Sequence, residues 1–301
     1  MRKLILALAV VVMCGGLTGC YEQPPLYNYN PTYEVNNTPA SSRNDINLDR
    51  PKIDSLKGKI TPIAKVVSDY QKIGFIKSKT EFETSSDFEN RKKFFLDNEK
   101  FKKTYFVIAH NALTPYDWLK YDVYSKRFSY KIIGNSIGIL NDSESTFEEY
   151  PFSLSISLSG KDAGSYTGVN AFGISKHVDK STFKSTVIVV TNKNELLASN
   201  NIKKLPMGFI EEITGTTKVI DPVKAEHIKN NIKLVYEFNP SIHYVFKDKL
   251  VSITKKTEYD SPTLDNPRDW KTDVTILFSE LIAVHLIDEK SKEVLGSIYF
   301  K

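Results

Sequence analysis

The alternation of apolar and polar residues is clearest in residues 152–159. Phe152, Leu154, Ile156 and Leu158 alternate there with four serines. Successive side chains of a strand point to opposite sides, so a repeat of two residues predicts a strand with one buried face. We expect the serines to line a solvated sheet face. A nucleophilic role for one of them is the less favoured alternative, because alternation alone explains their spacing.

Further strands are predicted from runs of β-branched and aromatic residues. They cover residues 104–109, 120–133, 183–190, 232–238, 244–254, 274–278, 281–287 and 293–300. The second of these ranges is expected to be a hairpin that turns at Ser125-Lys126. The last two flank a polar turn and predict another hairpin. Residues 281–287 are apolar on both faces and are therefore expected in the middle of a sheet.

Helical spacing predicts a few short helices. Ile63, Val66 and Tyr70 recur at intervals of three and four residues. Asp221-Pro222 predicts an N-cap followed by proline at the first helical position, in a helix that runs to about residue 230. With strands far outnumbering helices, the chain is expected to be an α+β protein dominated by antiparallel sheet.

A third helix is predicted between residues 86 and about 100. Ser86 and Glu89 have the spacing of a capping box. We expect its three phenylalanines, Phe88, Phe94 and Phe95, to face the core.

Residues 160–173 form a predicted loop with four glycines, and residues 262–270 form a second predicted loop. We expect a partner-binding surface on the first loop, with the second as a candidate neighbour. Glycine permits sharp turns and close approach of another molecule. Tyr166 and Phe172 lie in the first loop and Trp270 ends the second, and aromatic side chains are frequent binding anchors. We therefore identify these three residues as candidate partner-binding residues. The alternative is that Phe172 fills the core and the glycines only shape a turn.

The N-terminal residues have the layout of a bacterial lipoprotein signal. Arg2 and Lys3 precede an apolar stretch of ten residues, and the run Leu17-Thr18-Gly19-Cys20 resembles a lipobox. A spanning helix needs about 20 apolar residues, and this stretch is shorter. We predict cleavage before Cys20 and lipidation of its thiol with acyl chains such as palmitate. An uncleaved N-terminal anchor is the alternative.

The predicted organisation has three parts. Residues 1–19 form the signal peptide. Residues 20–52 form a tether, since residues 21–50 hold four prolines, six asparagines and four tyrosines. Residues 53–301 form the globular α+β domain, and a division into two subdomains near residues 141–150 stays open. The tyrosines indicate either low complexity or an aromatic stretch that lies at the lipid headgroups or binds a partner.

Composition limits the classes of function. The formal net charge of +5 is too mild to favour nucleic-acid binding in an exported protein. The two cysteines are Cys14, which leaves with the signal, and Cys20, which carries lipid. No cysteine then remains for a disulfide, a redox role or a zinc–thiolate site.

The search for catalytic or metal-binding patterns gives no candidate site. The five histidines show no paired spacing. His285 lies in an apolar predicted strand, where a hydrogen-bonded core histidine is expected rather than a metal ligand. Ser181-x-x-Lys184 and Ser252-x-x-Lys255 match the serine–lysine pattern of penicillin-binding enzymes. Both lie in strand-like segments, and the Lys-Thr-Gly and Ser-Asp-Asn motifs of those enzymes do not accompany them. We therefore do not interpret either pattern as a catalytic serine–lysine pair.

Four stretches together resemble a loose group of uncharacterised bacterial exported and lipoprotein domains. They are Phe82-Glu83-Thr84 before a helix carrying Arg91, Tyr121-Asp122, residues 168–173 (GVNAFG) and residues 263–267 (TLDNP). The resemblance covers about residues 80–301. It implies a shared envelope domain and no catalytic residues.

These observations predict a lipid-anchored, non-enzymatic protein of the cell envelope with a structural or interaction role. We expect it at the outer membrane facing the periplasm, held through lipid on Cys20. Its expected partner is an envelope protein or the cell wall, and no cofactor or metal is expected. The alternative is a cell-wall hydrolase or other envelope enzyme with an unrecognised site.

Overall fold

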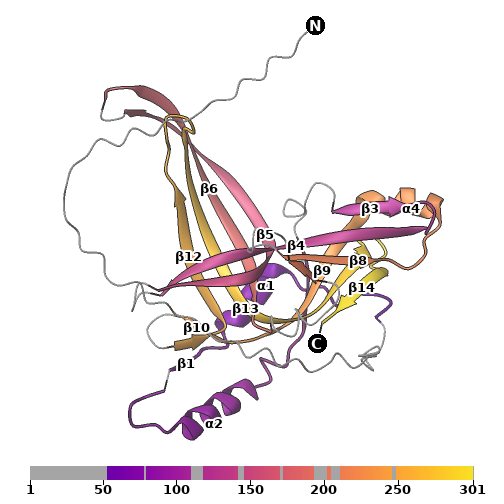
Figure 1. The fold of residues 1–301 in the computed structure, drawn as a ribbon, viewed down its shortest axis with the longest axis horizontal. Coiled ribbons are helices and arrows are strands. Elements are labelled where there is room, and N and C mark those ends of the chain that lie inside the picture. The colour runs from indigo at the N-terminus through magenta and orange to yellow at the C-terminus, as the bar shows by residue number, and fades with distance from the viewer. Residues whose placement is uncertain are drawn as a thin grey trace. The chain divides into compact units, whose positions relative to one another are not determined.

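The computed structural model divides the chain after Arg50, and residues Pro51–Lys301 form one unit. The structure describes residues 53–77, 79–109, 118–141, 146–169, 172–192, 202–204, 211–245 and 249–300 (Figure 1). The predicted signal peptide, Cys20 and the predicted tether lie outside these residues.

The described residues form an α+β fold that is mostly antiparallel sheet, as predicted. The helices are α1 (Ile63–Gln71), α2 (Ser85–Leu96) and α4 (Pro222–Ile228), which continues as a 3-10 turn, η2 (Lys229–Asn231). The strands are β1 (Phe75–Lys77), β2 (Tyr105–Ile108), β3 (Leu119–Asp122), β4 (Arg127–Asn141), β5 (Thr146–Val169), β6 (Ser175–Val190), β7 (Ile202–Lys204), β8 (Glu211–Thr216), β9 (Ile232–Pro240), β10 (His243–Val245), β11 (Lys249–Val251), β12 (Ile253–Asp260), β13 (Arg268–Asp288) and β14 (Val294–Tyr299).

The main sheet is organised around β13. Its strands follow the order β2-β9-β13-β6-β5-β4-β8-β7, with β12 and β14 also paired to β13 and β3 paired to β4. The first half of β13 lies between β6, which is parallel to it, and β12. The second half lies between β9 and β14. A three-stranded sheet, β1-β11-β10, lies in the same unit.

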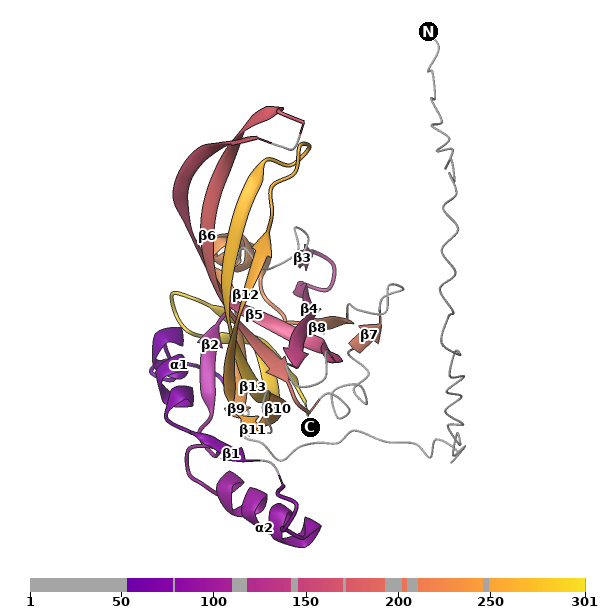
Figure 2. The same ribbon diagram turned by 90° about the vertical axis from the view of Figure 1, so that its left-hand side faces the viewer.

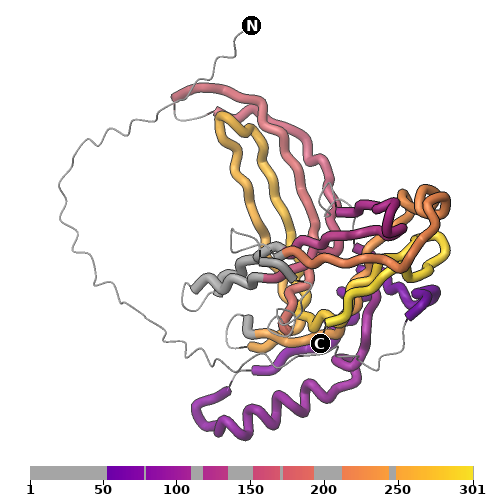
Figure 3. The backbone as a smooth tube through the Cα atoms, turned by 45° about the vertical axis from the view of Figure 1, so that its right-hand side comes forward, coloured from indigo at the N-terminus to yellow at the C-terminus, as the bar shows by residue number. Residues whose placement is uncertain are grey.

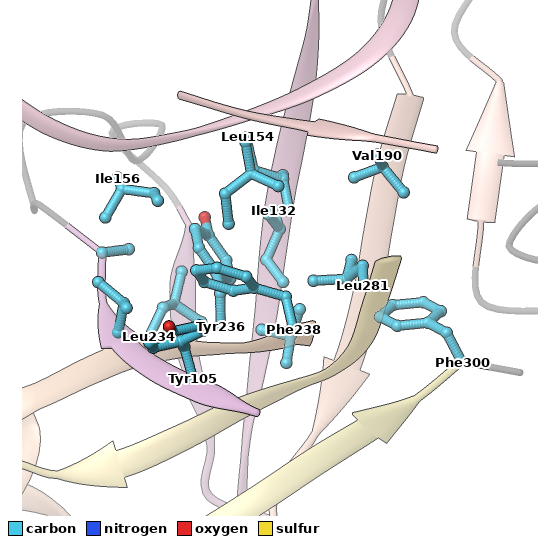
Figure 4. Close-up of a cluster of buried hydrophobic side chains, with 14 of the residues drawn as sticks. Tyr105, Ile132, Leu154, Ile156, Val190, Leu234, Tyr236, Phe238, Leu281 and Phe300 are labelled. Atoms are coloured by element: carbon cyan, nitrogen blue, oxygen red, sulfur yellow. The ribbon is translucent and has the colours of Figure 1, made fainter. Parts of the chain in front are cut away.

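The core lies on both faces of the main sheet around the second half of β13. The largest cluster, shown in Figure 4, includes Leu154, Tyr236, Phe238 and Leu281. Two smaller clusters are centred on Phe278 and on residues such as Val235 and Ile287. The prediction that residues 281–287 lie mid-sheet is confirmed, because all seven are buried.

Several local predictions are confirmed. Val66 and Tyr70 of α1 are buried, and Ile63 packs beside them. Asp221 caps α4 by accepting a hydrogen bond from the Val223 backbone at 2.9 Å, with proline at the first helical position. Strands β3 and β4 form the hairpin predicted to turn at Ser125-Lys126.

Helix α2 begins with a different cap from the one predicted. Thr84 Oγ1 accepts a hydrogen bond from the Asp87 backbone at 3.1 Å, and the hydroxyl donates to Asp87 Oδ2 at 2.6 Å. The predicted box of Ser86 and Glu89 is wrong, because Thr84 and Asp87 provide the same spacing two residues earlier.

The predicted burial of the α2 phenylalanines is wrong for Phe94. Phe88 is buried, and the half-buried ring of Phe95 lies 5.2 Å from that of Phe101. Phe94 is 84% exposed. Neighbouring residues of a helix are about 100° apart, so Phe94 points away when Phe95 points inward.

The strand predicted over residues 152–159 is part of β5, but a bulge changes the direction of its serines. Ser155 pairs with Val187, whereas Ser157 pairs with Thr186. Adjacent residues of β6 point to opposite faces, so Ser155 and Ser157 do as well. The expectation of a uniformly solvated serine face is wrong, since Ser153 is 3% exposed.

The loop predicted over residues 160–173 is mostly strand. Strand β5 runs to Val169 and pairs with β6 throughout. A β-carbon on Gly160 would lie 2.6 Å from the Phe183 ring, so this aromatic side chain of β6 covers the glycine. The glycine is thereby accommodated in a strand, where glycine is otherwise unfavourable. The second predicted loop is shorter than expected, because β13 begins at Arg268.

Candidate functional site

The candidate site is a four-stranded arm at one end of the main sheet. We define the arm as residues 157–169 of β5, 175–185 of β6, 253–260 of β12 and 268–275 of β13. In Figures 1 and 2 these strands continue side by side away from the helices. The tube in Figure 3 follows the same four strands as two adjacent hairpins. Along the arm most side chains are exposed or half-buried, unlike those of the sheet core.

Both outer edges of the arm lack a strand partner among the described residues. Beyond Ser153, β5 pairs only with β6, and β12 pairs only with β13. Open edges invite pairing with other chains, and bulges and charged residues discourage it. The bulge between Asp162 and Ser165 interrupts the β5 edge. The β5 edge is therefore irregular, whereas the β12 edge is regular and its strand carries the charged residues Lys255, Lys256 and Glu258.

The end of the arm gathers exposed apolar side chains. Phe172 is 89% exposed and Val169 is 64% exposed. Ile174, Tyr166 and Leu264 are also exposed at this end, and we call the five residues the arm tip. Tyr166 and Val169 lie three residues apart in β5 and therefore point to opposite faces of the arm. Tyr166 and Val169 belong to β5, Phe172 and Ile174 directly precede β6, and Leu264 lies between β12 and β13, so the tip depends on the pairing of β6 with β13.

Polar contacts hold the two turns of the tip together. Lys176 Nζ donates to the carbonyl of Leu264. Tyr166 Oη donates to Asp269 Oδ2 at 3.4 Å. Burial, followed by the Asp269 charge, raises the pKa of the Tyr166 phenol. The turn of residues 263–266 is closed by the hydrogen bond from the Asn266 backbone to the Thr263 hydroxyl at 3.0 Å. The apolar side chains are therefore presented by a braced framework.

Two glycines of this region have backbone conformations that favour glycine. Gly164 has φ of +87° and Gly173 has φ of +76°. Gly164 lies in the bulge of β5, and its backbone donates to Asp162 Oδ1 at 2.8 Å. Residues with side chains rarely adopt positive φ, so these glycines set the bulge and the turn of the tip.

The structure brings together two of the three predicted partner-binding residues. Tyr166 and Phe172 belong to the tip. Trp270 lies along the arm, its ring 5.7 Å from that of Phe183 and covered by the Arg268 guanidinium at 5.3 Å. Trp270 is on the opposite face of β13 from Asp269, the partner of Tyr166. The alternative that Phe172 fills the core is wrong.

Three apolar residues of the tip were not identified from the sequence: Val169, Ile174 and Leu264. Their position in or beside loops predicted to be solvated was the available signal, because apolar residues in such loops can indicate a binding surface. The pairing of β6 with β13, which brings Leu264 beside the other two, has no signal in the sequence.

A second group of exposed aromatic residues lies on β1 and α2. Phe75 and Phe82 are exposed beside Phe94 in a groove of about 690 Å³. Arg91 crosses the groove wall and donates to both carboxylate oxygens of Glu83, at 2.9 and 2.8 Å. This ion pair joins two of the four charged residues that line the groove; the other two are Lys77 and Asp87.

The one histidine–carboxylate–serine arrangement among the described residues is sealed inside the sheet. His285 Nδ1 lies 2.8 Å from Ser297 Oγ, and Nε2 lies 2.9 Å from Glu237 Oε2. The ring is 0% exposed and lies between Phe106 and Tyr299. Acyl-transfer catalysis needs a serine and a histidine that a substrate can reach. His285 is a hydrogen-bonded core histidine, as predicted.

The serine–lysine patterns do not form pairs in the structure. Residues three apart in a strand point to opposite faces, which separates Ser181 from Lys184 in β6. Ser252 is 0% exposed and donates to the Tyr70 carbonyl at 3.5 Å, while Lys255 is exposed. Within the described ranges no three acidic, histidine or cysteine side chains gather closely enough to hold a metal ion.

No helix among the described residues combines the length and apolar composition needed to cross a bilayer. Comparison of the chain with protein-family models, with curated proteins and with solved structures found no match.

Proposed function

We propose that the chain is a lipoprotein of the bacterial cell envelope whose folded part binds a partner protein through the arm tip. In this proposal palmitate-type acyl chains on Cys20 hold it at the outer membrane, facing the periplasm. The folded part carries out no catalysis. The proposal includes the relationship to bacterial exported and lipoprotein domains that the short motifs suggest.

The observation that carries the binding role is the exposed arm with an apolar end. Large exposed apolar patches on soluble proteins commonly mark interaction sites. Burial of a large apolar side chain contributes about 1.5–3 kcal/mol. Five such side chains are exposed at the end of the arm, so a complementary recess on a partner would gain from covering those that share a face. Phe172 is the strongest candidate anchor, because aromatic residues dominate binding energy at interfaces.

The framework of the tip favours binding with little loss of conformational entropy. The ladder between β5 and β6, and the contacts of Lys176 and Tyr166, order the described backbone at this end of the arm. Binding by a pre-organised surface avoids much of the entropy cost of ordering loops. The charged residues around the apolar centre match the polar rim of protein interfaces.

The alternative of an envelope hydrolase has less support. A hydrolase needs convergent acid, base or nucleophilic groups in an accessible pocket. The buried ring of His285 makes the most suggestive group inaccessible to a substrate. The proposed location is supported by the sequence pattern that ends at Cys20, together with its short apolar stretch.

Site-specific crosslinking in intact cells tests the role of the tip. A photoreactive phenylalanine analogue at position 264 is expected to give one discrete crosslinked species, identified by mass spectrometry. Phe172→Asp should abolish that species without changing the melting temperature. Phe94→Asp is the matched control, since Phe94 is equally exposed but lies on α2. Absence of a discrete species, its persistence in Phe172→Asp, or equal loss in both variants would contradict the proposal.

The anchor is tested separately by metabolic labelling. Wild-type protein should incorporate labelled palmitate and stay with the membrane fraction, whereas Cys20→Ser should do neither. Incorporation of label into the Cys20→Ser protein would show that the lipid is attached at a residue other than Cys20.

A further inference from the structure

A cleft of about 550 Å³ with both polar and apolar lining lies where the arm meets α1. Its floor comes from all four strands of the arm and includes Ser157, Ser159, Lys184, Thr186, Lys255 and Thr257. Ile63 and Val67 of α1 form an apolar wall. This volume is within the range of sites for small ligands.

The strand register places the polar side chains of the cleft in two rows. One row runs Ser159, Lys184, Asp273 and Thr257 across β5, β6, β13 and β12. The next row runs Ser157, Thr186, Thr275 and Lys255 across the same strands. Residues that are paired directly across strands point to the same face. The bulge at residues 155–157 is what brings the two serines to this face.

Three lysines line the cleft. Lys256 pairs with Glu258, Lys184 acts on the Asp273 carboxylate through its charge, and neither Lys184 nor Lys255 comes within 4.0 Å of a carboxylate among the described residues. The nearest carboxylate, Asp273, already accepts a hydrogen bond from Thr257 at 2.9 Å and lies 3.5 Å from Lys271 Nζ. These contacts lower the pKa of Asp273, the Thr257 hydrogen bond most strongly. Asp273 is therefore ionised and satisfied by its neighbours, and the cleft keeps an excess of positive charge.

Hydroxyl groups supply most of the remaining polar surface. Serine and threonine hydroxyls both donate and accept hydrogen bonds, which suits ligands that carry many hydroxyls. Lysine ammonium groups suit a carboxylate or phosphate. The apolar wall from α1 suits the C–H face of a sugar ring. The combination is specific to a ligand with an anionic group, several hydroxyls and one apolar face.

We propose that this cleft binds an anionic sugar of one or two rings, with Lys184 and Lys255 contacting the carboxylate or phosphate. Ser157, Ser159 and Thr257 bond the ring hydroxyls, and Ile63 and Val67 contact the ring itself. The site is independent of the arm tip, so it adds a second, small-molecule binding activity to the proposed protein-binding role.

Titration calorimetry on the full-length chain in detergent tests the site with four probes. They are digalacturonate, glucose 1-phosphate, neutral maltose and inorganic phosphate. At least one of the two anionic sugars should bind at least tenfold more tightly than both maltose and inorganic phosphate, and the better one identifies the anionic group. Failure of both anionic sugars to bind, or equal binding of inorganic phosphate, would overturn the proposal.

Lysine variants locate the binding within the cleft. Lys184→Gln and Lys255→Gln should each weaken binding of the preferred sugar at least tenfold without changing the melting temperature. Lys161→Gln is the matched control, because Lys161 is an exposed lysine of the arm that does not line the cleft. Equal weakening by Lys161→Gln would assign the effect to the general charge of the arm and overturn the site.

Discussion

The two halves of β13 have the same regular strand pairing but opposite surroundings. Residues 276–288 are buried, apart from Glu280; β9 pairs with this stretch from Ser279 onward, and β14 pairs with residues 283–287. Residues 268–275 lie between β6 and β12 and, apart from Val274, are exposed or half-buried. Chain direction and hydrogen bonding continue from one half into the other, while the side chains change from core to surface.

This contrast separates two contributions to stability. A backbone hydrogen bond contributes a net of about 1 kcal/mol, whereas buried apolar surface contributes about 25 cal/mol for each Å². The second half of β13 has both contributions, and the first half has chiefly the hydrogen bonds. The core therefore holds the arm in place through continuous strands, and the arm side chains are free to serve binding.

The largest expected difference is between two aromatic residues on the same face of β13. Phe278 is 0% exposed, with its ring 5.2 Å from that of His243. Phe278→Ala should lower the free energy of unfolding by about 3–5 kcal/mol in urea denaturation, because it leaves a cavity. Trp270→Ala should cost only about 1 kcal/mol, since its ring is half exposed. Equal costs would show that the arm is as well packed as the core.

A second comparison uses one histidine–carboxylate pair from each region. His285→Leu should cost about 3 kcal/mol, because Glu237 loses its buried partner. In the arm, His177 Nε2 lies 3.7 Å from Asp179 Oδ1, and both side chains are well exposed. His177→Leu should change the free energy of unfolding by less than about 0.5 kcal/mol. A cost below 1 kcal/mol for His285→Leu would mean that water satisfies Glu237 instead.

Two glycines that face phenylalanine rings give a smaller contrast. A β-carbon on Gly134 would lie 2.3 Å from the Phe152 ring, which is 1% exposed and has no room to move. Gly134→Ala should therefore cost about 2 kcal/mol through overpacking. Gly160→Ala meets the half-exposed ring of Phe183, which turns aside, and should cost below about 1 kcal/mol. Thermal denaturation of both variants measures the difference, and a larger loss for Gly160→Ala would reverse it.

The smallest effect is a pH dependence that originates in the core region. Lys103 Nζ lies 2.7 Å from Asp69 Oδ2, and this hydrogen bond with that from Lys65 lowers the pKa of Asp69 from 3.8 to about 2. A folded pKa below the unfolded one stabilises the protein above about pH 4, and that stabilisation is lost as the pH falls towards 2. Asp69→Asn should show a shallower loss of stability across this window in acid titration. Asp273→Asn, on the exposed arm, should change the pH dependence of the free energy of unfolding less than Asp69→Asn does. A larger change for Asp273→Asn would contradict the comparison.

The sequence predicts well those features that depend on a few neighbouring residues. The cap at Asp221, the hairpin at Ser125-Lys126 and the buried second half of β13 all follow from local spacing. The cap of α2 was misplaced because two overlapping patterns compete within six residues. Local rules identify the type of element there but do not choose between Thr84 and Ser86.

Features that depend on strand pairing had no local signal. Gly160 suggested a loop because the ring that covers it, Phe183, comes from another strand. The candidate partner-binding residues were chosen for aromatic character, which identified Tyr166 and Phe172 at the tip. It also selected Trp270, which packs within the arm. The cleft was missed because Lys184 and Lys255 come from separate strands that meet only through β13.

The position of β13 in the chain has a consequence for how the protein reaches its fold. Strands β2, β6 and β9 precede β13 in the sequence, and β13 pairs directly with β6 and β9. A growing chain emerges from its N-terminus, so these earlier strands are made before the strand that joins them. Assembly of the sheet thus waits for a late segment and for contacts between distant residues, which slow folding. Until residues 268–288 arrive, the open strands need protection from aggregation, and a helper that shields them would act on the unfinished chain.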